Sequence, residues 1–172
     1  MDLASTIRSV PDFPVKGILF YDITTLLKNP TALKASLDQL TDHYQGQEID
    51  LIVGIESRGF IFGMPLADRL NIGFVPVRKP GKLPAQSLAE SYELEYGTNT
   101  LEIHADAIEK GQRVLVVDDL LATGGTAQAT CNLIEKLGGQ VAGTAFVIEL
   151  TFLNGREKLK DYDIFALIQY DK

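Results

Sequence analysis

Two adjacent acids precede a turn rich in glycine and threonine in the sequence VLVVDDLLATGGT, residues 114–126. Backbone amides in a glycine-rich turn and at a helix N-terminus point outward without partners, so they can bind a phosphate without a lysine. Asp118 and Asp119 accept hydrogen bonds when ionised, which suits a ribose diol, and either could hold a water molecule bound to Mg²⁺. The pattern favours a sugar-phosphate site whose phosphate end consists of Ala122, Thr123, Gly124, Gly125 and Thr126.

The same stretch has a simpler interpretation as a solvated loop. Paired aspartates at a strand end often only cap the next helix, and acids followed by glycines do not by themselves decide between the two interpretations. Two common nucleotide motifs are excluded, because a Walker loop ends in Gly-Lys-Ser/Thr and a Rossmann fingerprint requires G-x-G-x-x-G. The rest of the chain must therefore be considered.

Two other segments carry cations that could bind an anionic group. Arg58 stands in the polar segment 56–59, and its planar guanidinium would match the geometry of a phosphate. Arg78, Lys79 and Lys82 lie in a segment interrupted by glycine and proline. For these three residues the alternative is a solvated basic turn.

Apolar runs and helical periodicity predict the elements that position these residues. The predicted strands are residues 51–55, 73–77, 113–117, 141–150 and 164–168. The predicted helices are residues 30–45, a helix running from the 56–59 segment towards Leu70, residues 126–137, and a short helix at 154–160. Strands that alternate with helices predict a parallel, doubly wound α/β sheet, in which ligands bind at the carboxyl ends of the strands. The polar segments 56–59 and 118–126 occupy such ends.

Composition narrows the class of protein. The chain has 172 residues, 45% of them hydrophobic, which predicts one domain over residues 1–172. A net charge of -7 argues against nucleic-acid and anionic-membrane partners. The lack of a long apolar run and of a basic leader predicts a cytoplasmic protein that does not enter a membrane. Cys131, His43 and His104 form no cluster at metal-ligand spacing, so we assign them to structure and expect no metal bound directly by the protein.

Residues 114–126 resemble the signature with which type I phosphoribosyltransferases bind phosphoribosyl pyrophosphate (PRPP). Other segments resemble the adenine phosphoribosyltransferase family in particular, and together they cover nearly the whole chain. They are Pro11-Asp12-Phe13-Pro14, Gly17-Ile18-Leu19-Phe20, residues 53–60, residues 78–84, Leu94-Glu95-Tyr96-Gly97 and Gly155-Arg156-Glu157-Lys158-Leu159. The resemblance implies purine salvage, in which adenine and PRPP give AMP and pyrophosphate, with Mg²⁺ arriving on PRPP. It also implies a flexible flap, a small N-terminal base-binding hood and a homodimer.

The resemblance gives each candidate residue a role. Asp118 and Asp119 would hold the ribose hydroxyls and stabilise the positive charge left on the sugar, while residues 122–126 would hold the 5-phosphate. The departing pyrophosphate would meet the cations Arg58, Arg78, Lys79 and Lys82. A cis peptide bond is implied between Glu56 and Ser57, with amides turned towards pyrophosphate.

Base recognition and the flap complete the expected site. Phe20 resembles the ring that stacks on adenine, although an ordinary core phenylalanine is an equal alternative. Relatives often have a basic residue at the next position, where this chain has Tyr21, and we predict no role for it. Residues 83–97 are expected to form a mobile lid carrying Tyr96 as a contact and Glu95 as the general acid and base, if closure raises the pKa of Glu95. The alternative is a plain exposed hairpin.

Two other functions remain open from the sequence. The chain could transfer the sugar to another base, such as hypoxanthine, guanine or xanthine, because the PRPP motif does not identify the base. It could also be a PRPP-binding regulator without catalysis.

Overall fold

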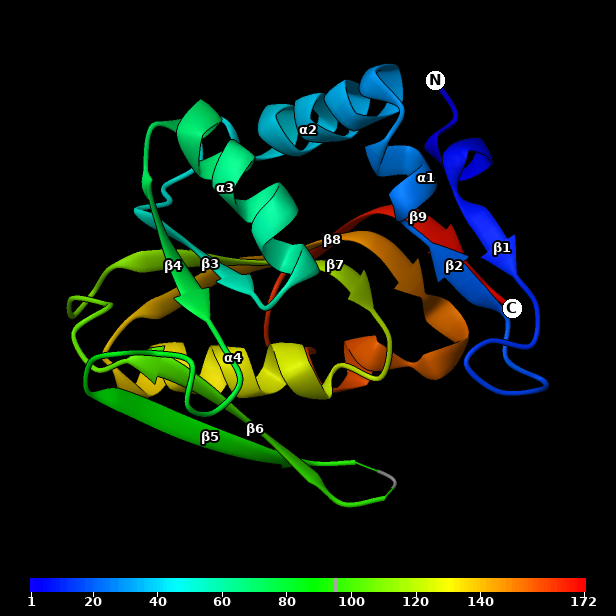
Figure 1. The fold of residues 1–172 in the computed structure, drawn as a ribbon. Helices are drawn as coiled ribbons and strands as arrows, with labels where there is room; N and C mark the ends of the chain where they lie inside the picture. Colours follow the sequence, from blue (N-terminus) through cyan, green and yellow to red (C-terminus); the bar gives the residue numbers. More distant parts are fainter. Residues whose placement is uncertain (95) are drawn as a thin grey trace.

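A parallel five-stranded sheet forms the centre of the computed structural model, which describes residues 1–94 and 96–172 (Figure 1). Its strands follow the order β4-β3-β7-β8-β9, and each neighbouring pair is parallel. Their bounds are β3 Leu51–Ile55, β4 Gly73–Val77, β7 Arg113–Leu121, β8 Gln140–Leu150 and β9 Ile164–Tyr170. The predicted parallel α/β sheet is confirmed.

Helices cover both faces of this sheet. Figure 1 shows α2 (Pro30–Tyr44) and α3 (Arg58–Leu70) above it and α4 (Gly125–Lys136) below it. Successive side chains of a strand point to opposite faces, so Leu115 and Val117 of β7 pack in the core with α2 and α3. Val114 and Val116 pack in the second core with α4. Among the described helices, none is long and apolar enough to cross a membrane.

Two smaller sheets lie outside the central one. The N-terminal segment, residues 1–27, which we call the hood, contains the antiparallel pair β1 (Arg8–Val10) and β2 (Phe20–Asp22). It also contains η1 (Leu3–Thr6) and α1 (Thr24–Leu27). An antiparallel hairpin of β5 (Ser87–Glu93) and β6 (Thr98–His104) follows β4. The short elements of the hood were not predicted from the sequence, because they are too short to show a periodicity.

Three predicted features of the chain are corrected by the structure. Strand β7 continues to Leu121 because β8 pairs with it that far, so Asp118 and Asp119 lie in a strand and not in a loop. The short helix predicted at 154–160 is reduced to the 3-10 turn η3 (Gly155–Glu157). The 3-10 turn η2 (Thr151–Leu153) precedes it, and Asn154 between the two has a left-handed conformation.

The hairpin is the third correction. The alternative given for residues 83–97, a plain exposed hairpin, does not hold for β5, because its Leu88 and Tyr92 are partly buried against the core that contains α4. Successive side chains of a strand point to opposite faces, so every second side chain of β5 faces inward. The polar composition of the whole segment does not show this alternation. Glu90 of the same strand forms an ion pair with Lys136 of α4, at 2.7 Å. The hairpin therefore packs on the body of the protein along β5.

Candidate active site

Three adjoining cavities lie around the carboxyl end of β7. The hood cavity, about 530 Å³, lies between the hood and the sheet and includes Arg58, Asp119 and Leu120 in its lining. The central cavity, about 310 Å³, is lined by Glu56, Ser57, Arg58, Lys79, Asp118, Asp119, Leu120 and Thr126. The turn cavity, about 80 Å³, is formed by residues 118 and 120–127 with Phe146. The shared lining residues make the three cavities one continuous site.

The turn cavity brings together all the residues predicted to bind phosphate, 122–126. Helix α4 begins at Gly125 after Gly124, whose φ of 89° is left-handed. A Cβ at Gly124 would also lie 2.6 Å from the carbonyl oxygen of Gly155, so the position requires glycine. Tyr92 of the hairpin reaches this turn, with its hydroxyl 2.9 Å from Oγ1 of Thr126. The unpaired amides at the start of α4 can bind an anion.

The two adjacent acids have different environments. Asp119 is buried, and its Oδ2 lies 2.5 Å from Nε of Arg58, which raises the pKa of Arg58 through the hydrogen bond and the charge of the carboxylate. Asp118 accepts a hydrogen bond from the backbone N–H of Asp119 at 2.8 Å. Burial, and then the neighbouring charge of Asp119, raise the pKa of Asp118 well above its ordinary value. The carboxylate of Asp119 is thus paired with the cation Arg58, whereas ionisation of the neighbouring Asp118 is disfavoured.

Glu56 holds the start of the basic segment beside the central cavity. Its Oε1 accepts hydrogen bonds from Nε of Arg78 at 2.9 Å and from the backbone N–H of Lys79 at 3.2 Å. Burial raises the pKa of Glu56, but these hydrogen bonds and the charges of Arg78 and Lys82 outweigh burial and lower it. Lys79 lines the central cavity, while Arg78 is engaged with Glu56. The peptide bond between Glu56 and Ser57 is cis, as the resemblance implied.

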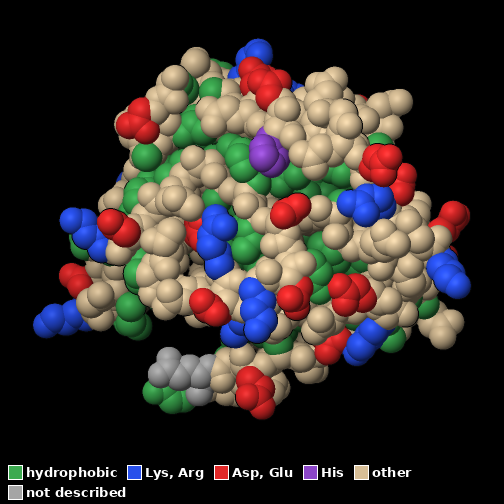
Figure 2. Space-filling model, turned by 180° about the vertical axis from the view of Figure 1, so that it is seen from behind, with side chains coloured by type: hydrophobic (Ala, Val, Ile, Leu, Met, Phe, Trp, Pro, Cys, Tyr) green, Lys and Arg blue, Asp and Glu red, His purple; other side chains and the backbone are tan. Residues whose placement is uncertain are grey.

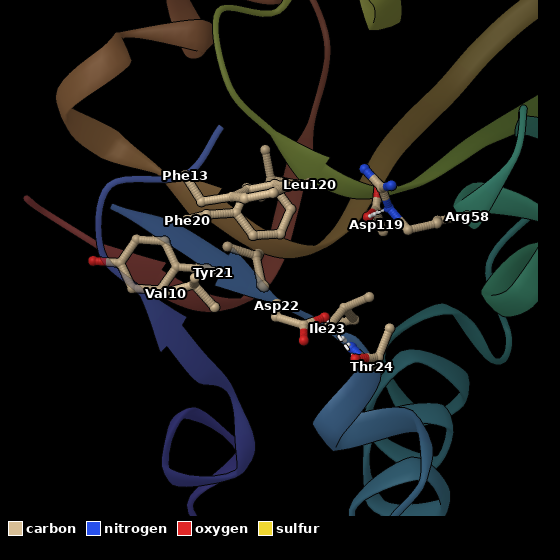
Figure 3. Close-up of a pocket in the computed structure, with 11 residues that line it drawn as sticks. Val10, Phe13, Phe20, Tyr21, Asp22, Ile23, Thr24, Arg58, Asp119 and Leu120 are labelled. Atoms are coloured by element: carbon tan, nitrogen blue, oxygen red, sulfur yellow. Dashed lines mark hydrogen bonds and ion pairs between the residues drawn. The ribbon is translucent and has the colours of Figure 1, made fainter. Parts of the chain in front are cut away.

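Aromatic rings dominate one end of the hood cavity (Figure 3). Phe13 and Phe20 meet edge to face, with ring centroids 5.1 Å apart, and Leu120 lies close to both in the figure. The ion pair of Arg58 and Asp119 lies at the other end. The cavity can therefore pack aromatic rings against the face of a flat molecule and present polar groups to its edge.

Tyr21, for which no role was predicted, ties the hood to the end of the chain. Its ring stacks on Tyr170 of β9, with centroids 3.8 Å apart and planes 10° apart. Its hydroxyl donates to the backbone carbonyl of Lys172 at 2.5 Å.

The hairpin end carries the last two predicted residues. Glu95, the predicted acid and base, lies outside the described residues. Tyr96 is 89% exposed and is absent from the lining of the three cavities. The structure does not bring Tyr96 to the other site residues, which leaves its role dependent on movement of the hairpin.

Comparison with known proteins decides the family. The model of the phosphoribosyl transferase domain matches residues 22–170. An adenine phosphoribosyltransferase of Chloroflexus aurantiacus is 64% identical over 169 residues, which cover 98% of each chain. That of Koribacter versatilis is 61% identical and covers 99% of this chain and 93% of the relative.

The chain belongs to the adenine phosphoribosyltransferase family. Among solved structures of this family, the enzyme of Thermoanaerobacter pseudethanolicus superposes with a TM-score of 0.95 at 57% identity, covering 98% of both chains. That of Saccharomyces cerevisiae, complexed with an imino-altritol bisphosphate and adenine, gives a TM-score of 0.90 at 44% identity and covers 96% of both. The family and the fold that the resemblance implied are confirmed.

Several residues of the site were missed from the sequence. Asp22 and Thr24 line the hood cavity, and Glu56 organises the basic segment. A signal for Asp22 was present, because residues two apart in a strand share a face and Asp22 follows Phe20 at that spacing. Glu56 stands in the polar segment 56–59 that was expected at the site, but its pairing with Arg78, 22 positions away, gave no signal in the sequence.

Proposed function

We propose that the three cavities bind the two substrates of the family's purine-salvage reaction, the transfer of the 5-phosphoribosyl group from PRPP to adenine. One observation carries the proposal: an apolar cavity with aromatic rings adjoins a polar cavity that carries acids and cations, and this leads to the glycine-rich turn at the start of α4. Base, sugar pyrophosphate and 5-phosphate need these three environments in this order. AMP and pyrophosphate are the products.

PRPP would lie across the central and turn cavities. Residues 122–126 would bind the 5-phosphate, and Asp118 and Asp119 the ribose hydroxyls. Departure of pyrophosphate leaves positive charge on the sugar, which neighbouring carboxylates stabilise. Arg58 and Lys79 line the central cavity, where they would bind pyrophosphate. Arg78 and Lys82, whose charges act on Glu56, would support them.

Adenine would occupy the hood cavity against Phe20. An aromatic ring beside a flat base contributes stacking in addition to buried area. The ring of Phe13 supports that of Phe20 from its edge. The hairpin would close over the sugar and exclude water, with Tyr96 as a contact and Glu95 as the acid and base at the ring nitrogen of adenine.

Magnesium would come to this site with the substrate. Within residues 1–94 and 96–172, no group of three or more His, Cys, Asp or Glu side chains is arranged to hold a metal ion. The donors that fit are the carboxylates of Asp118 and Asp119 in the central cavity, since Mg²⁺ prefers oxygen ligands and keeps several waters. We propose that these carboxylates hold the waters of an ion carried by PRPP, which would supply positive charge to the pyrophosphate.

A homodimer and a cytoplasmic location complete the proposal. Ile61 and Met64 are 40% and 51% exposed on α3, close in sequence to Arg58, and a second copy of the chain would cover them. On the face seen in Figure 2, acidic and basic side chains are interspersed, which gives no support to a nucleic-acid partner. Sedimentation tests the dimer, because an active monomer at micromolar concentration would contradict it. Cell fractionation tests the location.

Product formation tests the proposed reaction directly. Purified protein is mixed with PRPP, Mg²⁺ and one base at a time: adenine, hypoxanthine, guanine or xanthine. We expect AMP and pyrophosphate from adenine and much slower reaction of the other bases. Preference for another base would move the function to that base, and PRPP binding without turnover would indicate a regulator.

A further inference from the structure

A buried acid outside the three cavities carries an inference about the phosphate turn. The side chain of Glu149, in β8, is only 2% exposed. Arg156 donates to both of its oxygens, from Nε at 2.6 Å and from Nη2 at 2.8 Å, and Gln169 donates from Nε2 at 2.8 Å. Burial raises the pKa of Glu149, but these hydrogen bonds and the charge of Arg156 outweigh it and lower it. Glu149 is therefore held as a carboxylate.

Such a pair fixes geometry more than it adds stability. Replacing a paired buried charge by apolar groups of similar size is often neutral for folding, because desolvation offsets the attraction. Two parallel hydrogen bonds, however, allow the guanidinium of Arg156 few orientations relative to Glu149. The pair thus fixes the segment of chain that carries Arg156, which is η3.

The segment η3 lies directly against the phosphate turn. A Cβ added to Gly155 would lie 2.5 Å from the carbonyl oxygen of Ala122 and 2.8 Å from Cδ1 of Leu121. From the other side, a Cβ on Gly124 would lie 2.6 Å from the carbonyl oxygen of Gly155. The backbones are therefore in contact, and in Figure 1 the orange segment lies beside the start of α4.

Glu149 and the turn that follows Leu121 lie at the same carboxyl end of the sheet. Glu149 pairs in register with Leu121, the last residue of β7, and with Gln169 of β9. The start of the turn and the carboxylate that holds η3 are thus fixed to neighbouring strands. Downstream of η3, the backbone carbonyl oxygen of Lys158 accepts a hydrogen bond from the side-chain amide of Gln128 of α4 at 3.3 Å. The turn is enclosed between its own helix and η3.

We propose that the ion pair of Arg156 and Glu149 is a positioning pair for the 5-phosphate site. It holds η3 against the turn, so that the amides of residues 122–126 keep the direction that an anion requires. The proposal rests on the proposed binding of the 5-phosphate by this turn. Neither side chain lines the three cavities, and both act through Gly155.

The first experiment compares three substitutions by steady-state kinetics and by calorimetric titration with ribose 5-phosphate. Arg156→Met should raise KM for PRPP about 10-fold or more. It should raise the Kd for ribose 5-phosphate by the same factor, while KM for adenine changes less than about 2-fold. Arg156→Lys, which keeps the charge without the fork, should fall between. Arg69→Met is the matched control, because Arg69 pairs with Asp38 at 2.7 Å on the helices α3 and α2 and should leave every constant unchanged.

A double substitution separates positioning from simple neutralisation of a buried charge. Glu149→Leu with Arg156→Met removes both charges, so the thermal midpoint should recover towards the wild-type value. If the pair positions the turn, KM for PRPP stays raised; if it returns to the wild-type value, the proposal is overturned. An unchanged KM in Arg156→Met also overturns it. Should Arg156→Met not fold, Arg156→Lys and the double variant decide. Wild-type protein that does not bind ribose 5-phosphate would instead contradict the proposed function.

Discussion

The turn cavity and the hood cavity meet at Leu120, yet they are built differently. The turn cavity comes almost wholly from one stretch, residues 118–127, with Phe146 from the neighbouring strand. The hood cavity combines Val10, Phe13 and residues 20–24 with Arg58, the end of β7 and Ile148. A strand, a turn and a helix fix the first cavity by local backbone geometry. The second exists only because the hood packs against the end of the sheet.

The acids of the two cavities also differ, because the pKa of Asp118 is raised and that of Asp22 is lowered. Asp118 lines the central cavity beside Asp119, and burial and the charge of Asp119 raise its pKa. Asp22, in the hood, receives hydrogen bonds from Thr24 and Arg8, which lower its pKa to about 2. Burial at the strand end therefore disfavours the charge of Asp118, whereas the charge of Asp22 helps to hold the short elements of the hood together. Substitutions at each end should have separable effects.

The largest effect is expected at the hairpin, through Glu95. Glu95→Leu should lower turnover with adenine about 10²-fold or more and leave PRPP affinity nearly unchanged, because general acid and base catalysis contributes 10²–10⁴-fold. Glu95→Gln should retain part of the rate if hydrogen bonding is what matters. Steady-state kinetics measures both. Glu93→Leu, on the exposed end of β5, is the control. Normal turnover in Glu95→Leu would show that closure alone explains the hairpin.

Asp119→Asn should have the next largest effect and should act through PRPP. Loss of a charged hydrogen-bond acceptor costs about 1.5–3 kcal/mol, or roughly 10- to 150-fold in kcat/KM for PRPP. The ion pair with Arg58 is lost as well. Kinetics with each substrate varied in turn is the measurement, and Asp42→Asn, exposed on α2, serves as control. An unchanged kcat/KM for PRPP in Asp119→Asn would contradict a role of this carboxylate at the sugar.

Phe20→Leu should produce a smaller effect, confined to the hood cavity. Aromatic contacts contribute about 0.5–1.5 kcal/mol beyond buried area, so KM for adenine should rise roughly 3- to 10-fold. KM for PRPP should not change, since the turn cavity does not include Phe20. Phe152→Leu, 45% exposed, controls for loss of a ring. A rise in KM for PRPP alone would reverse the assignment of the two cavities.

The smallest effects concern stability and have opposite signs at the two ends. Because the folded-state pKa of Asp118 is raised, its ionisation destabilises the fold as pH rises from the unfolded-state value towards the folded-state pKa. Asp118→Asn should therefore raise the thermal midpoint by a few degrees, and more at pH 8 than at pH 5.

Asp22→Asn should lower the thermal midpoint at neutral pH. The lowered folded-state pKa of Asp22 means that its carboxylate stabilises the fold at pH values above the unfolded-state pKa, and this stabilisation is lost as the pH falls towards about 2. Thermal melts at both pH values measure these shifts. Equal signs would contradict the contrast between the ends.

The amino-acid sequence alone predicted the parallel sheet, its long helices and the glycine-rich turn at residues 122–126. Apolar strands and helices of regular period give local signals, and residues 114–126 carry their whole motif in one stretch. The family resemblance supplied Phe20, Glu95 and the basic segment, of which Phe20 and Lys79 line cavities. The roles of these residues stay predictions, as does the single domain.

Which distant side chains meet follows from the packing of the elements in the folded protein. Arg58 pairs with Asp119 across 61 positions, and Arg78 with Glu56 across 22. This packing also decided the opposite environments of Asp118 and Asp22 and the contact of η3 with the phosphate turn. No periodicity encodes such facts, because burial and charge pairing depend on which elements pack together. Local propensity therefore fixed the parts of this site, and packing fixed their electrostatics.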